Sequence, residues 1–154
     1  MFSDVSRSDG KTLETFCMAF VNKEPEKIEK IFGDYLWNTI SIRDTVVAKE
    51  RKENFYHGIL LGVPGYKAAW RTMSNPESGI GYSDVLIETG DGRIGIAIEL
   101  KYAEDGVMDA ACVKALRQIE EKDYMARLKQ DGMQNFIKYG IACFNKNCKV
   151  VMGD

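Results

Sequence analysis

The segment RIGIAIELK, residues 93–101, has the pattern of a buried strand that ends in charged side chains, and the predicted architecture follows from it. Side chains alternate between the two faces of a strand. One face carries only large aliphatic residues, namely Ile94, Ile96, Ile98 and Leu100. The other face carries Gly95, Ala97, Glu99 and Lys101. We therefore predict one core face, and a second face on which a helix packs closely over the small residues while an acid and a base stand at the strand's end.

The segment before this strand, residues 82–88, predicts a second strand of the same kind, with Asp84 and Glu88 on one face. The sequence TGDG at 89–92 predicts a tight turn between the two strands. In such a hairpin Asp84 and Glu99 are equally far from the turn. They are therefore expected to be directly opposed, with about 5 Å between their Cβ atoms.

The rest of the chain predicts an α/β domain with a central mixed β-sheet and helices packed on it. Apolar spacing indicates two short helices near the N-terminus, two longer helices and five strands. After the N-terminal helices, the expected order is helix 42–61, strands 66–73, 82–88 and 93–101, helix 108–130, and strands 136–144 and 149–152. We divide the chain into a helical extension, residues 1–40, and an α/β domain, residues 41–154.

Composition is typical of a single-domain soluble protein, with 154 residues of which 45% are apolar and 29% are charged. The net charge of −2 gives no global positive field that would attract nucleic acid, although a local basic cleft stays open. Four cysteines without a CxxC pair and a single histidine argue against zinc, and we expect free thiols in a reducing cytoplasm. No apolar run reaches the roughly 20 residues that span a bilayer, and there is no GxxxxGK[ST] loop.

Asp84 and Glu99 would repel each other across the hairpin unless something compensates their charge. A divalent cation is the obvious compensator, since Mg²⁺ binds one or two carboxylates and substrate phosphates while it keeps several waters. Lys101, on the same face as Glu99, would neutralise developing charge or orient the attacking water, so the set suits phosphodiester hydrolysis. Spacing alone supports a second interpretation equally, in which Asp84 and Lys101 form a cross-strand ion pair and Glu99 is merely exposed.

These residues resemble the signature of the PD-(D/E)xK nuclease superfamily. The match consists of Asp84, a spacer that contains a turn, and Glu99-Leu100-Lys101, with Ser83 at the commonly degenerate proline position. Other segments recur together with it: ENFYHG at 53–58, SNPESG at 74–79, ALRQI and KDY within 115–124, and KYGIA at 138–142. In this combination the chain is similar, over residues 45–152, to a nuclease-like domain at the C-terminus of many bacterial AAA-ATPase-like proteins.

The resemblance implies a restriction-endonuclease-like core in α-β-β-β-α-β-β order, and it implies a metal site. Asp84 and Glu99 would be ligands of Mg²⁺ or Mn²⁺. Glu53, on the first helix of the core, would join the metal shell, often through water. Lys101 would be the catalytic lysine. For Glu53 the ordinary role of a solvated helix residue also stays open.

Three further residues would be accessory groups by the same resemblance. Gln118 and Tyr124 would lie near the substrate phosphate, although Gln118 also suits an ordinary polar boundary position in an amphipathic helix. His57, one helical turn after Glu53, would hydrogen-bond a site residue or a phosphate, or serve as a structural histidine.

The expected function is therefore metal-dependent hydrolysis of nucleic acid, DNA before RNA, by a metal-activated water in the cytoplasm. One alternative is a catalytically inactive nuclease-fold module that binds nucleic acid or protein. Another is an interaction domain that works with an ATPase partner, or with a fused ATPase domain outside this chain. A homodimer is among the forms considered, and no membrane partner is expected.

Overall fold

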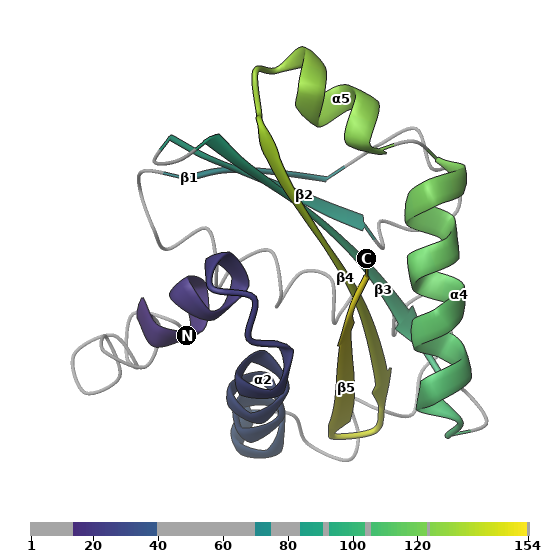
Figure 1. The fold of residues 1–154 in the computed structure, drawn as a ribbon. Helices are drawn as coiled ribbons and strands as arrows, with labels where there is room; N and C mark the ends of the chain where they lie inside the picture. Colours follow the sequence, from purple (N-terminus) through teal and green to yellow (C-terminus); the bar gives the residue numbers. More distant parts are fainter. Residues whose placement is uncertain are drawn as a thin grey trace.

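A computed structural model describes residues 14–39, 70–74, 84–90, 93–103, 106–122 and 124–153 of the chain. The strands are β1 (Trp70–Ser74), β2 (Asp84–Thr89), β3 (Ile94–Tyr102), β4 (Asn135–Phe144) and β5 (Asn147–Met152). They form one sheet in the order β1-β2-β3-β4-β5, in which only β3 and β4 are parallel neighbours (Figure 1). The predicted α/β class with a mixed central sheet is confirmed, and the arrangement is consistent with a restriction-endonuclease-like core.

The hairpin of β2 and β3 has the predicted register, because Asp84 is the backbone partner of Glu99. The Thr89 side chain helps to close the turn. Its hydroxyl accepts a hydrogen bond from the N–H of Ile94 at 3.2 Å and donates one to the carbonyl oxygen of Ile94 at 3.3 Å. A slip of one residue would turn every side chain of a strand to the other face, so this closure keeps the acids of both strands on a common face.

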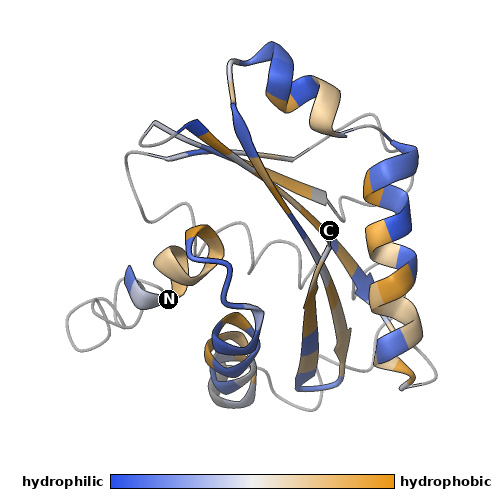
Figure 2. Cartoon of the chain, viewed as in Figure 1, coloured by the Kyte–Doolittle hydropathy of each residue, from blue (hydrophilic) through white to orange (hydrophobic). Residues whose placement is uncertain are grey.

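The two faces of the sheet pack against different helices. The aliphatic row of β3 belongs to a large core that includes apolar residues of the helical segment 14–21 and of α2 (Pro25–Thr39). The opposite face packs against α4 (Met108–Glu121) and α5 (Tyr124–Gln130) in a smaller cluster. Figure 2 shows hydrophobic residues in the middle of the sheet, and α4 as a helix with both hydrophobic and hydrophilic residues. The face predicted to lie under a helix is therefore the face that carries Glu99.

The single helix predicted over residues 108–130 is wrong, since this segment forms two helices, α4 and α5. Lys122 ends α4, with φ −85° and ψ −4°, and its N–H donates to the carbonyl oxygen of Gln118 at 2.9 Å. A new helix then begins at Tyr124. The apolar spacing continues across the break, because both helices bury residues on the same side of the sheet. That continuity is why the sequence pattern alone predicted one helix.

Each of these helices crosses the sheet over a glycine. A Cβ added at Gly140 on β4 would lie 2.7 Å from the backbone oxygen of Cys112 in α4. A Cβ added at Gly95 on β3 would lie 3.0 Å from Cδ1 of Leu128 in α5. The predicted close approach of a helix over the small residues of β3 is thus confirmed at Gly95.

The N-terminal helices are integrated with the sheet. Phe16 and Phe20 of segment 14–21 lie in the same core cluster as Ile96 and Ile98 of β3. On α2, Glu29 accepts a hydrogen bond through Oε1 from the N–H of Val150 at 2.9 Å, which gives an amide of the edge strand β5 a partner. The division of the chain at residue 40 stays a prediction.

Some predicted elements lie outside the described residues, namely helix 42–61 and the first part of strand 66–73, and Glu53 and His57 lie there too. All four cysteines, Cys17, Cys112, Cys143 and Cys148, are free, as expected. Among the described helices, none has the length and apolar character needed to cross a membrane.

Candidate active site

Glu99 is a carboxylate on the helix-covered face of β3, and its side chain is 0% exposed. A buried charge is costly unless it is paired and hydrogen-bonded. The Nζ atoms of Lys101 and Lys122 lie 3.5 Å and 3.6 Å from Oε1 of Glu99. The hydroxyl of Tyr124 donates a hydrogen bond to Oε2 at 3.3 Å. These groups compensate the charge of Glu99 and fix its orientation.

The partners of Glu99 come from three elements of the fold. Lys101 follows it by two residues on the same face of β3, and its side chain is 16% exposed. Lys122 caps the end of α4, and its side chain is 31% exposed. Tyr124 begins α5 and is buried, and its ring centroid lies 5.8 Å from Nζ of Lys122, a cation–π contact. The break between the two helices is therefore what brings Lys122 and Tyr124 onto one carboxylate.

Asp84 occupies the first position of β2, directly opposite Glu99 in the backbone register. Its side chain is outside the described part of the chain, and so are Glu53 and His57 as whole residues. The structure thus brings Glu99, Lys101 and Tyr124 together in space. The metal-binding roles of Asp84, Glu99 and Glu53 stay predictions.

The second interpretation left open by the spacing is wrong where it has Glu99 exposed, while its ion pair between Asp84 and Lys101 involves a side chain outside the described part of the chain. Glu99 is fully buried, and Lys101 forms an ion pair with it. The physical reason is that α4 and α5 cover this face of β3, with Ile119 and Leu128 buried against the sheet. A spacing pattern within two strands contains no information about that cover.

Gln118 lies one helical turn before Lys122 on α4, so the two residues share a side of the helix. Its Oε1 atom is buried and has no hydrogen-bond partner among the described residues. A buried polar atom without a partner costs about 1–3 kcal/mol, which calls for a group that completes it. Both interpretations of Gln118, an accessory residue and a polar boundary residue, stay predictions.

The candidate metal ligands around Glu99 are oxygen donors. Within the described residues, no group of three or more His, Cys, Asp or Glu side chains is placed to hold a metal ion. The oxygen donors of the site are the buried carboxylate of Glu99 and, by register, Asp84. Such hard oxygen ligands suit Mg²⁺ or Mn²⁺, so the residues present fit a divalent cation of this class.

A second buried acid, Glu88, lies on β2 four residues after Asp84, and its side chain is 7% exposed. Its Oε1 atom lies 3.5 Å from Nη1 of Arg71, while Oε2 has no hydrogen-bond donor among the described residues. Burial, and then the neighbouring carboxyl of Asp131, raise the pKa of Glu88 from 4.5 to about 7. The hydrogen bond with Glu88, and then Arg127, lower the pKa of Asp131. A proton on Glu88 that is shared with Asp131 therefore satisfies both carboxyl groups.

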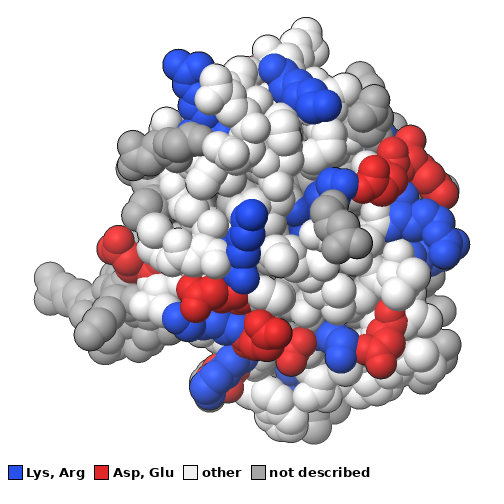
Figure 3. Space-filling model, in the orientation of Figure 1, with Lys and Arg blue, Asp and Glu red and all other residues white. Residues whose placement is uncertain are grey.

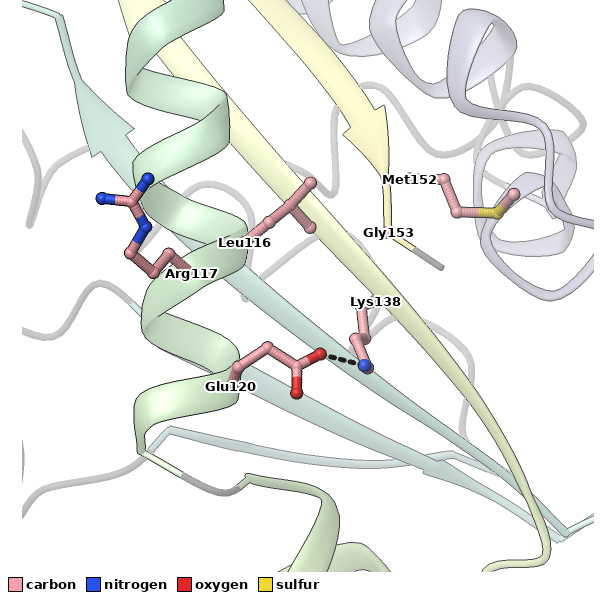
Figure 4. A pocket seen from close by; sticks show the side chains of 6 residues that line it. All are labelled: Leu116, Arg117, Glu120, Lys138, Met152 and Gly153. Carbon is pink, nitrogen blue, oxygen red and sulfur yellow. Dashed lines mark hydrogen bonds and ion pairs between the residues drawn. The ribbon is translucent and has the colours of Figure 1, made fainter.

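A pocket of about 330 Å³ lies elsewhere on α4 (Figure 4). It is lined by Leu116, Arg117, Glu120, Lys138, Met152 and Gly153. Glu120 extends toward Lys138, and the two side chains form an ion pair that neutralises both. Neither Glu99 nor any of its charged neighbours lines this pocket, so we place the candidate active site at Glu99 rather than here.

Lys122 is the contact of Glu99 to which sequence reasoning gave no role. It lies four residues after Gln118 and two before Tyr124, and this spacing was the signal that could have found it. The signal was hidden by the prediction of one continuous helix, because residues two apart do not share a side of a helix. Only the break after α4 lets Lys122 and Tyr124 reach the same carboxylate.

A family model that describes the PD-(D/E)XK nuclease superfamily matches residues 51–152 of the chain. The matched range includes the residues discussed above from Glu53 to Tyr124. Searches among curated proteins and among solved structures gave no significant match.

Proposed function

The chain belongs to the PD-(D/E)XK nuclease superfamily, and from this membership we propose that it is a metal-dependent nuclease that hydrolyses phosphodiester bonds of DNA. The observation that carries the proposal is the environment of Glu99: a fully buried carboxylate, two lysine ammonium groups beside it, and an acid opposite it in the backbone register. Membership supports a nuclease-type activity in general, and these residues support the hydrolytic mechanism in particular.

In this proposal Glu99 and Asp84 hold Mg²⁺ or Mn²⁺, with Glu53 as a further ligand from the preceding helix. A bound cation of this kind lowers the pKa of a coordinated water and stabilises charge on the phosphate oxygens. Tyr124 keeps Glu99 oriented through its hydrogen bond to Oε2. Lys101, at 3.5 Å from Oε1, is placed to orient the attacking water or to stabilise negative charge that develops on the phosphate.

The choice of DNA and of an ATPase partner rests on the sequence resemblance. The cytoplasmic location rests on the cysteines without a disulfide pattern, and a second copy of the chain stays a proposal. Charge distribution gives a further constraint on the substrate contact. On the face drawn in Figure 3, basic and acidic residues are interspersed, in keeping with the net charge of −2. We therefore assign the phosphate contact in the active site to a local group, Lys101.

The test is cleavage of duplex DNA, single-stranded DNA and RNA oligonucleotides by the purified chain with Mg²⁺, with Mn²⁺ and with a chelator. We expect cleavage that requires the cation and falls by about a thousandfold in Lys101→Ala and in Asp84→Asn. The control is Lys114→Ala, an exposed lysine on α4, which should cleave like the unchanged chain. Thermal melting shows whether each variant is folded.

Full activity in both Lys101→Ala and Asp84→Asn would contradict the proposed mechanism. If the chain binds Mn²⁺ through Glu99 but cleaves none of the three nucleic acids, the nuclease-fold module without catalysis becomes the better account.

A further inference from the structure

Two ammonium groups share one oxygen of Glu99, since Nζ of Lys101 and Nζ of Lys122 lie 3.5 Å and 3.6 Å from Oε1. One buried carboxylate needs one counter-charge, so the second lysine exceeds what Glu99 alone requires. A cation held by Glu99 and its register partner Asp84 would add positive charge beside both lysines, and the phosphodiester groups of a nucleic acid would match it.

The two lysines differ in their position in the fold and in the exposed fraction of their side chains. Lys101 is a residue of β3, is paired in register with Ala142 of β4, and is 16% exposed. Lys122 is the C-cap of α4, its side chain is 31% exposed, and it reaches Glu99 past the ring of Tyr124. A lysine on a flexible stem can change partners by rotation alone. Lys122 is therefore the lysine that can leave Glu99 without disturbing the sheet.

We propose that Lys122 is a substrate-binding residue that pairs with Glu99 in the metal-free chain and moves to a phosphate oxygen of the nucleic acid in the loaded site. The inference rests on the proposed nuclease function and deepens it, because it names a residue that would bind the substrate. Before loading, Lys122 compensates the charge of buried Glu99. After loading, Lys101 remains beside Glu99, and Lys122 donates a charge-assisted hydrogen bond to a non-bridging oxygen of the substrate.

If Lys122 exchanges partners in this way, its removal should have opposite effects on the binding of the metal cation and on the binding of nucleic acid. Lys122 repels a cation that approaches Glu99, so its removal should tighten metal binding in the absence of nucleic acid. The same removal takes away one phosphate contact, so it should weaken nucleic-acid binding and its dependence on salt. A lysine that only supported the position of Glu99 would weaken metal binding when removed and would leave the salt dependence unchanged.

The experiment uses the full chain with Lys122→Gln and Lys122→Met, the second of which keeps an apolar stem over Tyr124. Lys114→Gln, the same substitution at an exposed position of α4, is the matched control. Calorimetric titration with Mn²⁺ alone should give a dissociation constant about three- to tenfold lower in both Lys122 variants. Binding of a labelled DNA duplex in Ca²⁺ should be about three- to tenfold weaker, with a slope of log K against log salt reduced by about 0.9.

Lys122→Arg should restore both the duplex affinity and the salt slope, because it returns the positive charge. Mn²⁺ binding that is weaker or unchanged in both neutral variants would overturn the proposal, and so would an unchanged salt slope. If the unchanged chain binds no Mn²⁺ at all, the proposed function falls together with this inference. If the unchanged chain binds Mn²⁺ but the Lys122 variants bind Mn²⁺ and DNA as the unchanged chain does, the inference alone is wrong.

Discussion

Two buried acids on the same face of the sheet, Glu99 on β3 and Glu88 on β2, have opposite surroundings. Glu99 is 0% exposed and lies beside two lysine ammonium groups and a tyrosine hydroxyl. Glu88 is 7% exposed and lies beside the carboxyl of Asp131, with one arginine at 3.5 Å. Burial is nearly the same at the two positions, so the difference lies in the described neighbours. An acid, Asp131, lies beside Glu88 together with the arginines Arg71 and Arg127, whereas two lysines are the charged side chains found beside Glu99 in the described part of the chain.

That difference decides which end of the hairpin suits a cation. The lysines beside Glu99 favour its charged form, which is the form that binds a hard cation. The acid beside Glu88 favours the protonated form, and its pKa is raised to about 7. A neutral carboxyl is a poor ligand for Mg²⁺, so the Glu88 end suits a structural role. Parallel substitutions at the two acids test this contrast.

The largest expected effect is on catalysis, when each acid is replaced by its amide. Glu99→Gln removes a charged ligand and should lower the rate of metal-dependent cleavage by about a thousandfold. Glu88→Gln keeps the centre around Glu99 intact and should change the rate by less than about threefold. Cleavage assays on both variants at saturating Mn²⁺ measure the two effects. Equal losses of rate would show that the two acids are not distinguished by function.

The next effect is on stability, through the helix that carries Lys122 and Gln118. Gly140→Ala would place a Cβ 2.7 Å from the backbone oxygen of Cys112, so α4 must shift away from the sheet. We expect the free energy of unfolding to fall by about 2–3 kcal/mol, and Mn²⁺ binding to change with it, because α4 supplies a neighbour of Glu99. Urea denaturation and calorimetry measure the two changes.

Gly90→Ala is the control for that experiment, because an added Cβ there has no atom within 4 Å among its described surroundings. It should change the free energy of unfolding by less than about 0.5 kcal/mol. If Gly140→Ala is equally neutral, the close packing of α4 over β4 is not what positions the candidate site.

The strand part of this centre could be predicted from the sequence because its information is local. Alternation along residues 93–101 fixed which face is apolar, and the turn at 89–92 fixed the offset that pairs Asp84 with Glu99. A tight turn determines which residues of the two strands that it joins lie opposite each other. No tertiary contact was needed to obtain the register.

The helix part could not be predicted because its information is not local. The break after Lys122 leaves the apolar spacing of residues 108–130 unchanged, and no proline or glycine marks it. Asp131 meets Glu88 only because α5 folds back over β2, a contact between residues 43 positions apart in the sequence. Lys122 acquires its role from such packing. The sequence alone therefore assigned it no role.

A smaller effect is the dependence of stability on pH at the other acid. Because the pKa of Glu88 in the folded chain, about 7, lies above its ordinary value of 4.5, the folded state holds this proton more tightly than the unfolded chain does. The stability that the protonated group contributes is complete below pH 4.5 and is lost as the pH rises through 7. Glu88→Gln keeps the neutral form, so it should remove this loss and raise the free energy of unfolding at pH 8 by about 1 kcal/mol.

Urea denaturation from pH 4 to pH 9 measures that profile in the unchanged chain and in the variant. The pKa of Asp131 is lowered, so its contribution is present above pH 3.8 and is lost only as the pH falls further. The two acids therefore act in separate windows of pH. A profile between pH 5 and pH 8 that is the same with Glu88 and with Gln at this position would show that the carboxyl pair does not share a proton.

The smallest effect concerns the arginine next to Glu88. Arg71 lowers the pKa of Glu88, but its side chain is 63% exposed and solvent screens the pair. Arg71→Gln should therefore move the midpoint of the pH-dependent loss of stability upward by a few tenths of a pH unit, and change the free energy of unfolding by less than about 0.5 kcal/mol. Arg117→Gln, an exposed arginine on α4, should leave the midpoint where it is. A downward shift of the midpoint in Arg71→Gln would mean that the raised pKa of Glu88 does not arise from the balance of burial, the acid Asp131 and the two arginines Arg71 and Arg127. The contrast with Glu99 would then need another cause.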